Sequence, residues 1–144
     1  MCSYCGCQDS VFIIANFTSE HEAIINALGD VKRAVASKQI SKIRVGTQAL
    51  RALLEPHTLS EERSLFSELK KLDEFRKSVE DLCEEHVKIA NLIDHVDDQI
   101  EGSFEILQRV LYRHIDKEEN GLFPASIMAL DSSAWDRAIE AAKY

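Results

Sequence analysis

The sequence has little of the material that a turn-rich fold requires. It contains five Gly and two Pro in 144 residues, which is too few for the many turns of a β-sandwich or barrel. It has no surplus of basic residues, and its formal net charge of −8 argues against partners such as nucleic acid or an anionic membrane surface. It also has no apolar run approaching the roughly 20 residues that cross a bilayer. We therefore expect a single helical domain with neither kind of partner.

Cysteine is scarce and unevenly placed. Cys2, Cys5 and Cys7 crowd the start of the chain and Cys83 lies far along it, which is not the pattern of a secreted disulfide framework. The opening MCSYCGCQDS lacks the basic and apolar regions of a signal peptide. We expect a cytoplasmic protein with reduced thiols, in which Cys83 serves as a small buried hydrophobe.

The first eight residues differ in character from the rest of the chain. We expect residues 1–8 to form an appended cysteine-rich tail and residues 9–144 to form the folded domain. Cys-x2-Cys-x-Cys offers three soft ligands, whereas a closed structural zinc site normally takes four. The tail thiols are therefore either free or part of a redox switch or metal relay.

Apolar residues recur at three- and four-residue steps in four long segments, a spacing that places them on one face of a helix. The segments cover about 9–38, 41–71, 75–98 and 101–122. The connections between them are short, which makes consecutive helices antiparallel. The predicted fold is all-α: an up-down-up-down antiparallel four-helix bundle with a short C-terminal helix.

Local signals refine these helices. Pro56 lies inside the second segment, and we expect a bend just before His57, because a mid-helix proline removes a backbone donor. Pro124 weakens or bends the end of the fourth segment. Asp131 or Ser132 is expected to cap the final short helix, over 134–142.

Four of the five histidines lie in the apolar stripes, one in each long segment, where an unpaired polar side chain is costly to bury. They are His21, His57, His86 and His114. Glu61 and Glu118 each follow one of these histidines by four residues, so each pair points the same way with a one-turn stagger. The fifth histidine, His95, is about half a turn out of phase with His86 and is expected at the surface.

Two further observations connect the histidines. Residues 57–66 align without a gap with residues 114–123, matching His, Glu, Glu, Leu and Phe at the same spacing. Counting residues from the expected turns places all four histidines within about two helical turns of one another. We therefore expect them to share one site at mid-bundle.

Four imidazoles and two carboxylates at one level form a ligand set for a pair of metal ions. Imidazole suits Fe, Zn and Cu, and each carboxylate can bridge two cations. Zinc could bind on affinity alone, whereas positions left open beside the bridges favour redox-active iron. We expect two irons per chain, bridged by carboxylates and an oxo group. The expected metal ligands are His21, His57, Glu61, His86, His114 and Glu118.

These residues resemble the hemerythrin-like HHE cation-binding proteins, and the likeness covers nearly the whole chain. The family pattern is a lone His, a His-x3-Glu, a lone His and a second His-x3-Glu on successive helices. The flanks are similar as well, with Pro56-His57 before Glu61-Glu62 and Lys117-Glu118-Glu119 before Leu122-Phe123-Pro124. The opening Met-Cys-Ser-Tyr-Cys-Gly-Cys is similar to that of a bacterial subgroup. The resemblance implies a hemerythrin-like bundle around a di-iron site.

The chain departs from oxygen-carrying hemerythrins at two positions. They have a second histidine four residues after the one on the third helix, where this chain has Ala90. They also use His-x4-Asp on the fourth helix, where this chain has His114 and Glu118. One iron is then expected to have a ligand missing or replaced, by water or by Glu62. The departures favour sensing or reaction over reversible oxygen storage.

Several functions stay open at this point. The first is a non-haem di-iron protein that binds, senses or reacts with dioxygen, peroxide or nitric oxide. A peroxidase-like or catalase-like enzyme would use the same metals, because no other catalytic constellation is present. The alternatives are a helical protein-interaction module without metal, in which the histidines are satisfied core residues, and a zinc-binding variant of the bundle.

Overall fold

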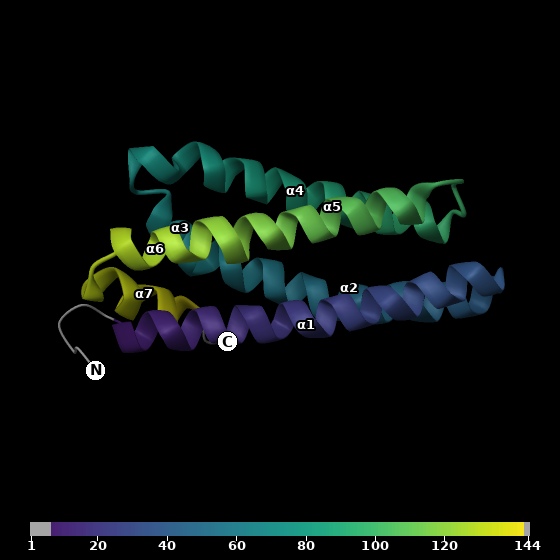
Figure 1. The fold of residues 1–144 in the computed structure, drawn as a ribbon, viewed down its shortest axis with the longest axis horizontal. Helices are drawn as coiled ribbons and strands as arrows, with labels where there is room; N and C mark the ends of the chain where they lie inside the picture. Colours follow the sequence, from purple (N-terminus) through teal and green to yellow (C-terminus); the bar gives the residue numbers. More distant parts are fainter. Residues whose placement is uncertain (1–6, 143–144) are drawn as a thin grey trace.

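The computed structural model describes residues 7–142, and every regular element among them is a helix. Four long helices lie side by side (Figure 1): α1 (Cys7–Ser37), α2 (Ile40–Arg63), α4 (Asp73–Asp97) and α5 (Ser103–Lys117). Shorter elements gather at one end of these rods: α3 (Leu65–Leu69), α6 (Phe123–Ala129) and α7 (Ser132–Ala142). A π-helical turn, η1 (Glu118–Leu122), joins α5 to α6. The predicted all-α bundle with a short C-terminal helix is confirmed.

The long helices alternate in direction and enclose one interior. α1 packs against α2 and α5, and α4 packs against the same two helices, so the four form a closed ring. α1 and α4 are each followed by a tight turn with a residue at positive φ, Lys38 (58°) and Gln99 (58°). A left-handed residue of this kind commonly ends a helix and reverses the chain. Gly102, at φ 76°, then leads into α5.

The second predicted helix is two helices in the structure. α2 continues through Pro56 and ends at Arg63. Ser64 has φ −103° and ψ −96°, outside the helical region, and its N–H and Oγ both donate to the Ser60 carbonyl, at 3.0 and 2.6 Å. The prediction of one helix over 41–71 is therefore wrong at Ser64, where this polar turn separates α2 from α3.

The C-terminal helix is fixed to the bundle by polar contacts and by its apolar face. The side chain of Asp131 accepts a hydrogen bond from the Ala134 N–H at 2.9 Å, which is the expected N-terminal cap. Arg137 reaches across to Glu68 on α3, with Nη2 to Oε1 at 2.8 Å. Trp135 is fully buried against the neighbouring helices.

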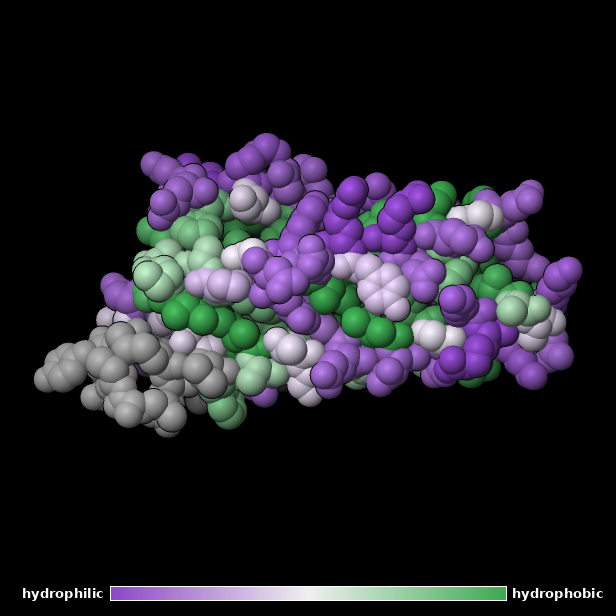
Figure 2. Space-filling model, viewed as in Figure 1, coloured by the Kyte–Doolittle hydropathy of each residue, from purple (hydrophilic) through white to green (hydrophobic). Residues whose placement is uncertain are grey.

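The apolar interior consists of two clusters rather than one. One surrounds Leu28, Leu50 and Leu107 in the half with the two tight turns, and the other surrounds Phe17 and Trp135 near the short helices. Along α1, α2 and α4 the predicted site residues fall between the residues of the two clusters. Figure 2 shows hydrophilic residues over much of this face, with hydrophobic residues visible between them. Among the described residues, no helix combines the length and apolar character that a membrane span requires.

Candidate metal centre

The structure brings all six predicted site residues together in the layer between the apolar clusters. α1 contributes His21, α2 contributes His57 and Glu61, α4 and α5 contribute one histidine each, and η1 contributes Glu118. All six side chains are buried, and both glutamates are fully inaccessible. Ring centroids of His86 and His114 lie 4.8 Å apart, and those of His21 and His57 lie 4.7 Å apart. The histidines therefore meet at one level of the bundle.

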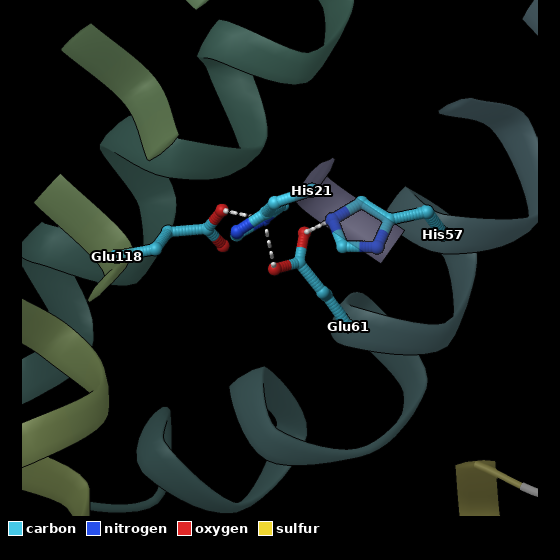
Figure 3. A group of neighbouring side chains, drawn as sticks. All are labelled: His21, His57, Glu61 and Glu118. Carbon is cyan, nitrogen blue, oxygen red and sulfur yellow. Dashed lines mark ion pairs between the residues drawn. The ribbon is translucent and has the colours of Figure 1, made fainter. Parts of the chain in front are cut away.

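The six side chains form two groups of four that share both glutamates. One group adds His21 and His57 to the glutamates, and the other adds His86 and His114. In each group the potential ligand atoms all lie within 4.8 Å of one another. Figure 3 shows the first group, with the carboxylate of Glu61 between the two imidazoles and that of Glu118 on the far side of His21.

Each carboxylate spans the two groups. Glu61 Oε1 lies 3.3 Å from Nε2 of both His57 and His86. Glu118 Oε1 lies 3.2 Å from Nε2 of both His21 and His114. Carboxylates in this arrangement can bridge two cations, each of which would also receive two imidazole nitrogens.

Unsatisfied polar atoms test whether the site fits metal ions. Seven buried side-chain N or O atoms among the described residues have no hydrogen-bond partner, and six of them belong to this site. They include all four carboxylate oxygens of Glu61 and Glu118. Leaving such atoms unpaired costs about 1–3 kcal/mol each, and more for a charged group. Cations between them would satisfy these oxygens, so the residues fit a metal centre.

Four further glutamates support the histidines from outside. Glu20 Oε1 lies 2.9 Å from Nδ1 of His57, and Glu62 Oε2 lies 2.9 Å from Nδ1 of His86. Glu119 lies 2.6 Å from Nδ1 of His21 in the same way, whereas Glu85 lies 3.7 Å from Nδ1 of His114, within ion-pair but beyond hydrogen-bond distance. Each contact joins one helix to the next, from α1 to α2 to α4 to α5 and back through η1 to α1. We call these four residues the outer carboxylate ring.

The outer carboxylate ring determines which nitrogen of each imidazole faces the interior. A carboxylate at Nδ1 favours a proton on that nitrogen, which leaves the Nε2 lone pair free for a ligand at the centre. It also fixes the ring orientation. Aromatic packing adds to this, because Phe66 stacks on His86 with an interplanar angle of 9° and Phe123 stacks on His21 with an angle of 7°.

The π-helical turn directs the side chains of Glu118 and Glu119 toward different parts of the site. The Phe123 N–H bonds to the Glu118 carbonyl five residues earlier, where an α-helix would use the residue four earlier. Glu118 faces the interior, and its neighbour Glu119 reaches the imidazole of His21 on α1. The sequence analysis predicted an uninterrupted helix here, and no composition signal marked the wider turn.

Burial and charge shift the pKa values of the two shared glutamates in opposite directions. Burial, together with the charge of Glu118, raises the pKa of Glu61 well above its usual range. Burial also acts to raise the pKa of Glu118, but its contacts with Glu61, His114 and His21 outweigh that effect and lower the pKa. Without cations, the interior thus favours a neutral Glu61 and an ionised Glu118. Bound cations would stabilise the ionised form of both.

The groups around His114 form a charged pair at the rim of the site. Burial alone would lower the pKa of His114, but its contacts with Glu118 and Glu85 and the nearby charges raise it to about 9. The contact with His114, helped by hydrogen bonds from Lys117, lowers the pKa of Glu85 to about 2. A charged imidazolium cannot bind a metal, so binding there releases this proton.

The remaining candidates lie away from the two groups. His95 is exposed, as predicted. Cys83 is half-buried beside the second apolar cluster, and burial together with the charge of Glu62 raises its pKa to about 11, as expected for an unreactive thiol. Cys2 and Cys5 lie outside the described residues. The sequence analysis did not single out Glu20 or Glu85, although each directly precedes a predicted ligand histidine.

The fold and this layer of histidines and glutamates define a metal-binding four-helix bundle. The family model for the hemerythrin HHE cation-binding domain matches residues 13–126, most of the chain. The chain belongs to this family, and the resemblance predicted from the motifs is confirmed. It finds no match among curated proteins or among solved structures.

Proposed function

We propose that this chain is a cytoplasmic non-haem di-iron protein that binds, senses or reacts with a small oxidant such as dioxygen, peroxide or nitric oxide. The observation that carries the proposal is the pair of buried groups that share Glu61 and Glu118. Their ligands would be the six side chains predicted from the sequence. A pair of irons held there would supply redox electrons and open coordination positions.

Different residues of the chain would have different roles in such a site. The four Nε2 atoms would hold the ions, and the two shared carboxylates would bridge them and lower the charge of the site. The outer carboxylate ring would keep each imidazole in one tautomer and orientation. The apolar clusters on both sides would exclude bulk water, which strengthens the electrostatic interactions inside.

Two features favour iron and a small oxidant over the other readings. Six unsatisfied buried atoms in one layer do not suit an interaction module whose histidines are satisfied core residues. Each group supplies two imidazoles and two shared carboxylates, which leaves positions open beside the bridges on a six-coordinate iron, as redox chemistry requires, whereas zinc bound by the same four donors would have a closed tetrahedral shell and no redox change.

Anaerobic loading with ferrous iron followed by exposure to each oxidant tests the function. We expect the ferrous protein to react with dioxygen or peroxide to give the near-ultraviolet absorption of an oxo-bridged ferric pair, and to bind nitric oxide when dioxygen is absent. The zinc-loaded protein is the matched control, because it occupies the same ligands without redox change. Iron-loaded protein whose spectrum stays unchanged with all three reagents would refute the proposal.

A further inference from the structure

A cavity of about 200 Å³ opens between α2 and α4 beside the candidate metal centre. Its lining includes His86 but neither His21 nor His57. His86 is also the most exposed of the four site histidines, at 8 % against 3 % or less for the others. The two groups of potential ligands are therefore not equivalent, because the cavity reaches only the one that contains His86.

The wall of this cavity continues into the interior. A second void, of about 10 Å³, lies among the four histidines and shares Leu54, Thr58, His86 and Ile89 with the outer cavity. Ala90, one turn after His86, lines the outer cavity at an exposed position, where its methyl group leaves the opening clear.

The size and charge of the cavity limit what can pass through it. The inner void, at about 10 Å³, is close to the smallest space that holds one water molecule, so only very small molecules could reach it from the outer cavity. Arg51 at the rim is paired with Asp94 and Asp97, at 2.7 Å each, and Glu55 adds a further negative charge. The lining is therefore acidic, which disfavours anions and leaves uncharged molecules unaffected.

From this geometry we propose that the cavity between α2 and α4 is the access and binding pocket for a small uncharged molecule. The molecule meets His86 first and so binds in the half of the site formed by His86 and His114, and Ala90 keeps its path open. The inference rests on the proposed di-iron function and adds to it the route, the half of the site and the ligand class.

Nitric oxide binding to the ferrous-loaded protein tests the route. The variant Ala90→Phe places a large ring at the opening of the cavity, and we expect it to slow nitric oxide association, measured by anaerobic stopped-flow absorbance, by more than tenfold at unchanged iron content. The smaller plug Ala90→Leu should give an intermediate rate. The control Val87→Phe enlarges an exposed side chain on the same helix and should leave the rate within twofold of the original. Equal rates in all four proteins would overturn the route, although the di-iron function would stand.

Azide, a small anion, tests the charge selection. Replacing the rim carboxylate in Glu55→Gln should speed azide association severalfold while nitric oxide association changes by less than twofold. An azide rate that does not rise would overturn the assignment of an uncharged ligand.

Xenon provides a readout that needs no iron. Crystals of the metal-free protein under xenon pressure should show xenon against the apolar wall of the cavity formed by Leu54, Ile89 and Ile93, and crystals of Ala90→Phe should not. Xenon absent from the original protein would overturn the pocket. A protein that binds xenon but takes up no iron would instead refute the proposed function, and with it the role of the pocket.

Discussion

At the scale of single residues, the candidate centre depends on pairs of neighbouring side chains with different tasks. At four places in the chain, one predicted ligand faces the interior and the glutamate next to it in the sequence contacts a histidine on the next helix. Glu61 and Glu62 show this division, since Glu61 lies between two imidazoles and Glu62 contacts Nδ1 of His86. Glu62 therefore supports a histidine from outside and belongs to neither group of potential ligands.

The outer carboxylate ring should tune metal affinity without supplying ligands. We expect Glu20→Ala, which removes the partner of His57, to weaken ferrous iron binding by roughly 10–100-fold. Its matched control is Glu22→Ala, which removes an exposed carboxylate from the other side of His21. Anaerobic competition against a chromophoric chelator measures both affinities. Equal affinity in the two variants would show that the outer contact has no role in metal binding.

The sequence predicted the inner residues better than the outer ones. Each site histidine stood out because it is polar in an apolar stripe, and that signal is local. Glu20 and Glu85 carry no such signal. Their partners lie on adjacent helices, and which side chains meet there depends on the rotation of each helix about its axis, which apolar spacing does not determine.

At the scale of elements, the helices were predictable and their interruptions were not. α1 and α4 begin and end within two residues of the predicted segments, because their apolar repeats are long and regular. Ser64 and η1 interrupt helices whose apolar spacing continues across the break. The spacing of His114 and Glu118 fits an unbroken α-helix, so the wider π-helical turn after it gave no sequence signal.

Alanine substitutions at Gly29 and Gly46 test how closely α1 and α2 approach each other. A Cβ at Gly46 would lie 3.3 Å from Val31 Cγ2 and 3.5 Å from the Val31 Cα on α1, whereas a Cβ at Gly29 would meet only the mobile end of Arg33, at 3.6 Å. Alanine in a helix interior gains about 0.5–1 kcal/mol over glycine. We expect Gly29→Ala to raise the free energy of unfolding by this amount and Gly46→Ala to show no gain or a loss. Urea denaturation of both variants checks this, and an equal gain at Gly46 would contradict the close packing.

At the scale of the whole molecule, the polar layer divides the interior while the short helices close one end. Figure 1 shows α3, α6 and α7 together at that end, away from the two tight turns. Glu68 joins two of these helices, because it accepts hydrogen bonds from Lys71 beside it and from Arg137 on α7. The carboxylate of Glu68 therefore helps to hold the C-terminal helix against α3.

The Glu68 contacts should make stability depend on pH in the acid range. Burial acts to raise the pKa of Glu68, but hydrogen bonds from Arg137 and Lys71 outweigh it, so the folded protein has a pKa below the ordinary 4.5. The stabilisation from these contacts is fully present above the ordinary pKa of 4.5 and is lost as the pH falls through the lowered pKa of the folded protein. We expect Glu68→Gln to lower the free energy of unfolding by about 1 kcal/mol at neutral pH. The variant should also lose less stability than the original protein on acidification.

Chemical denaturation between about pH 6 and pH 3 measures this dependence. Glu105→Gln is the control, because Glu105 is exposed on α5, and its pH profile should follow that of the original protein. If Glu68→Gln loses stability as steeply as the original protein between those limits, the carboxylate does not hold α7 in the way described.

The central claim is that two cations share Glu61 and Glu118, and the number of irons bound per chain tests it most directly. After anaerobic loading and removal of free metal, elemental analysis should find two ferrous ions per chain, one for each group of four potential ligands. His57→Ala should lower this number to one or fewer, and the exposed His95→Ala should leave it unchanged. A folded protein that retains no iron, or that binds as much after His57→Ala as before, would contradict the account.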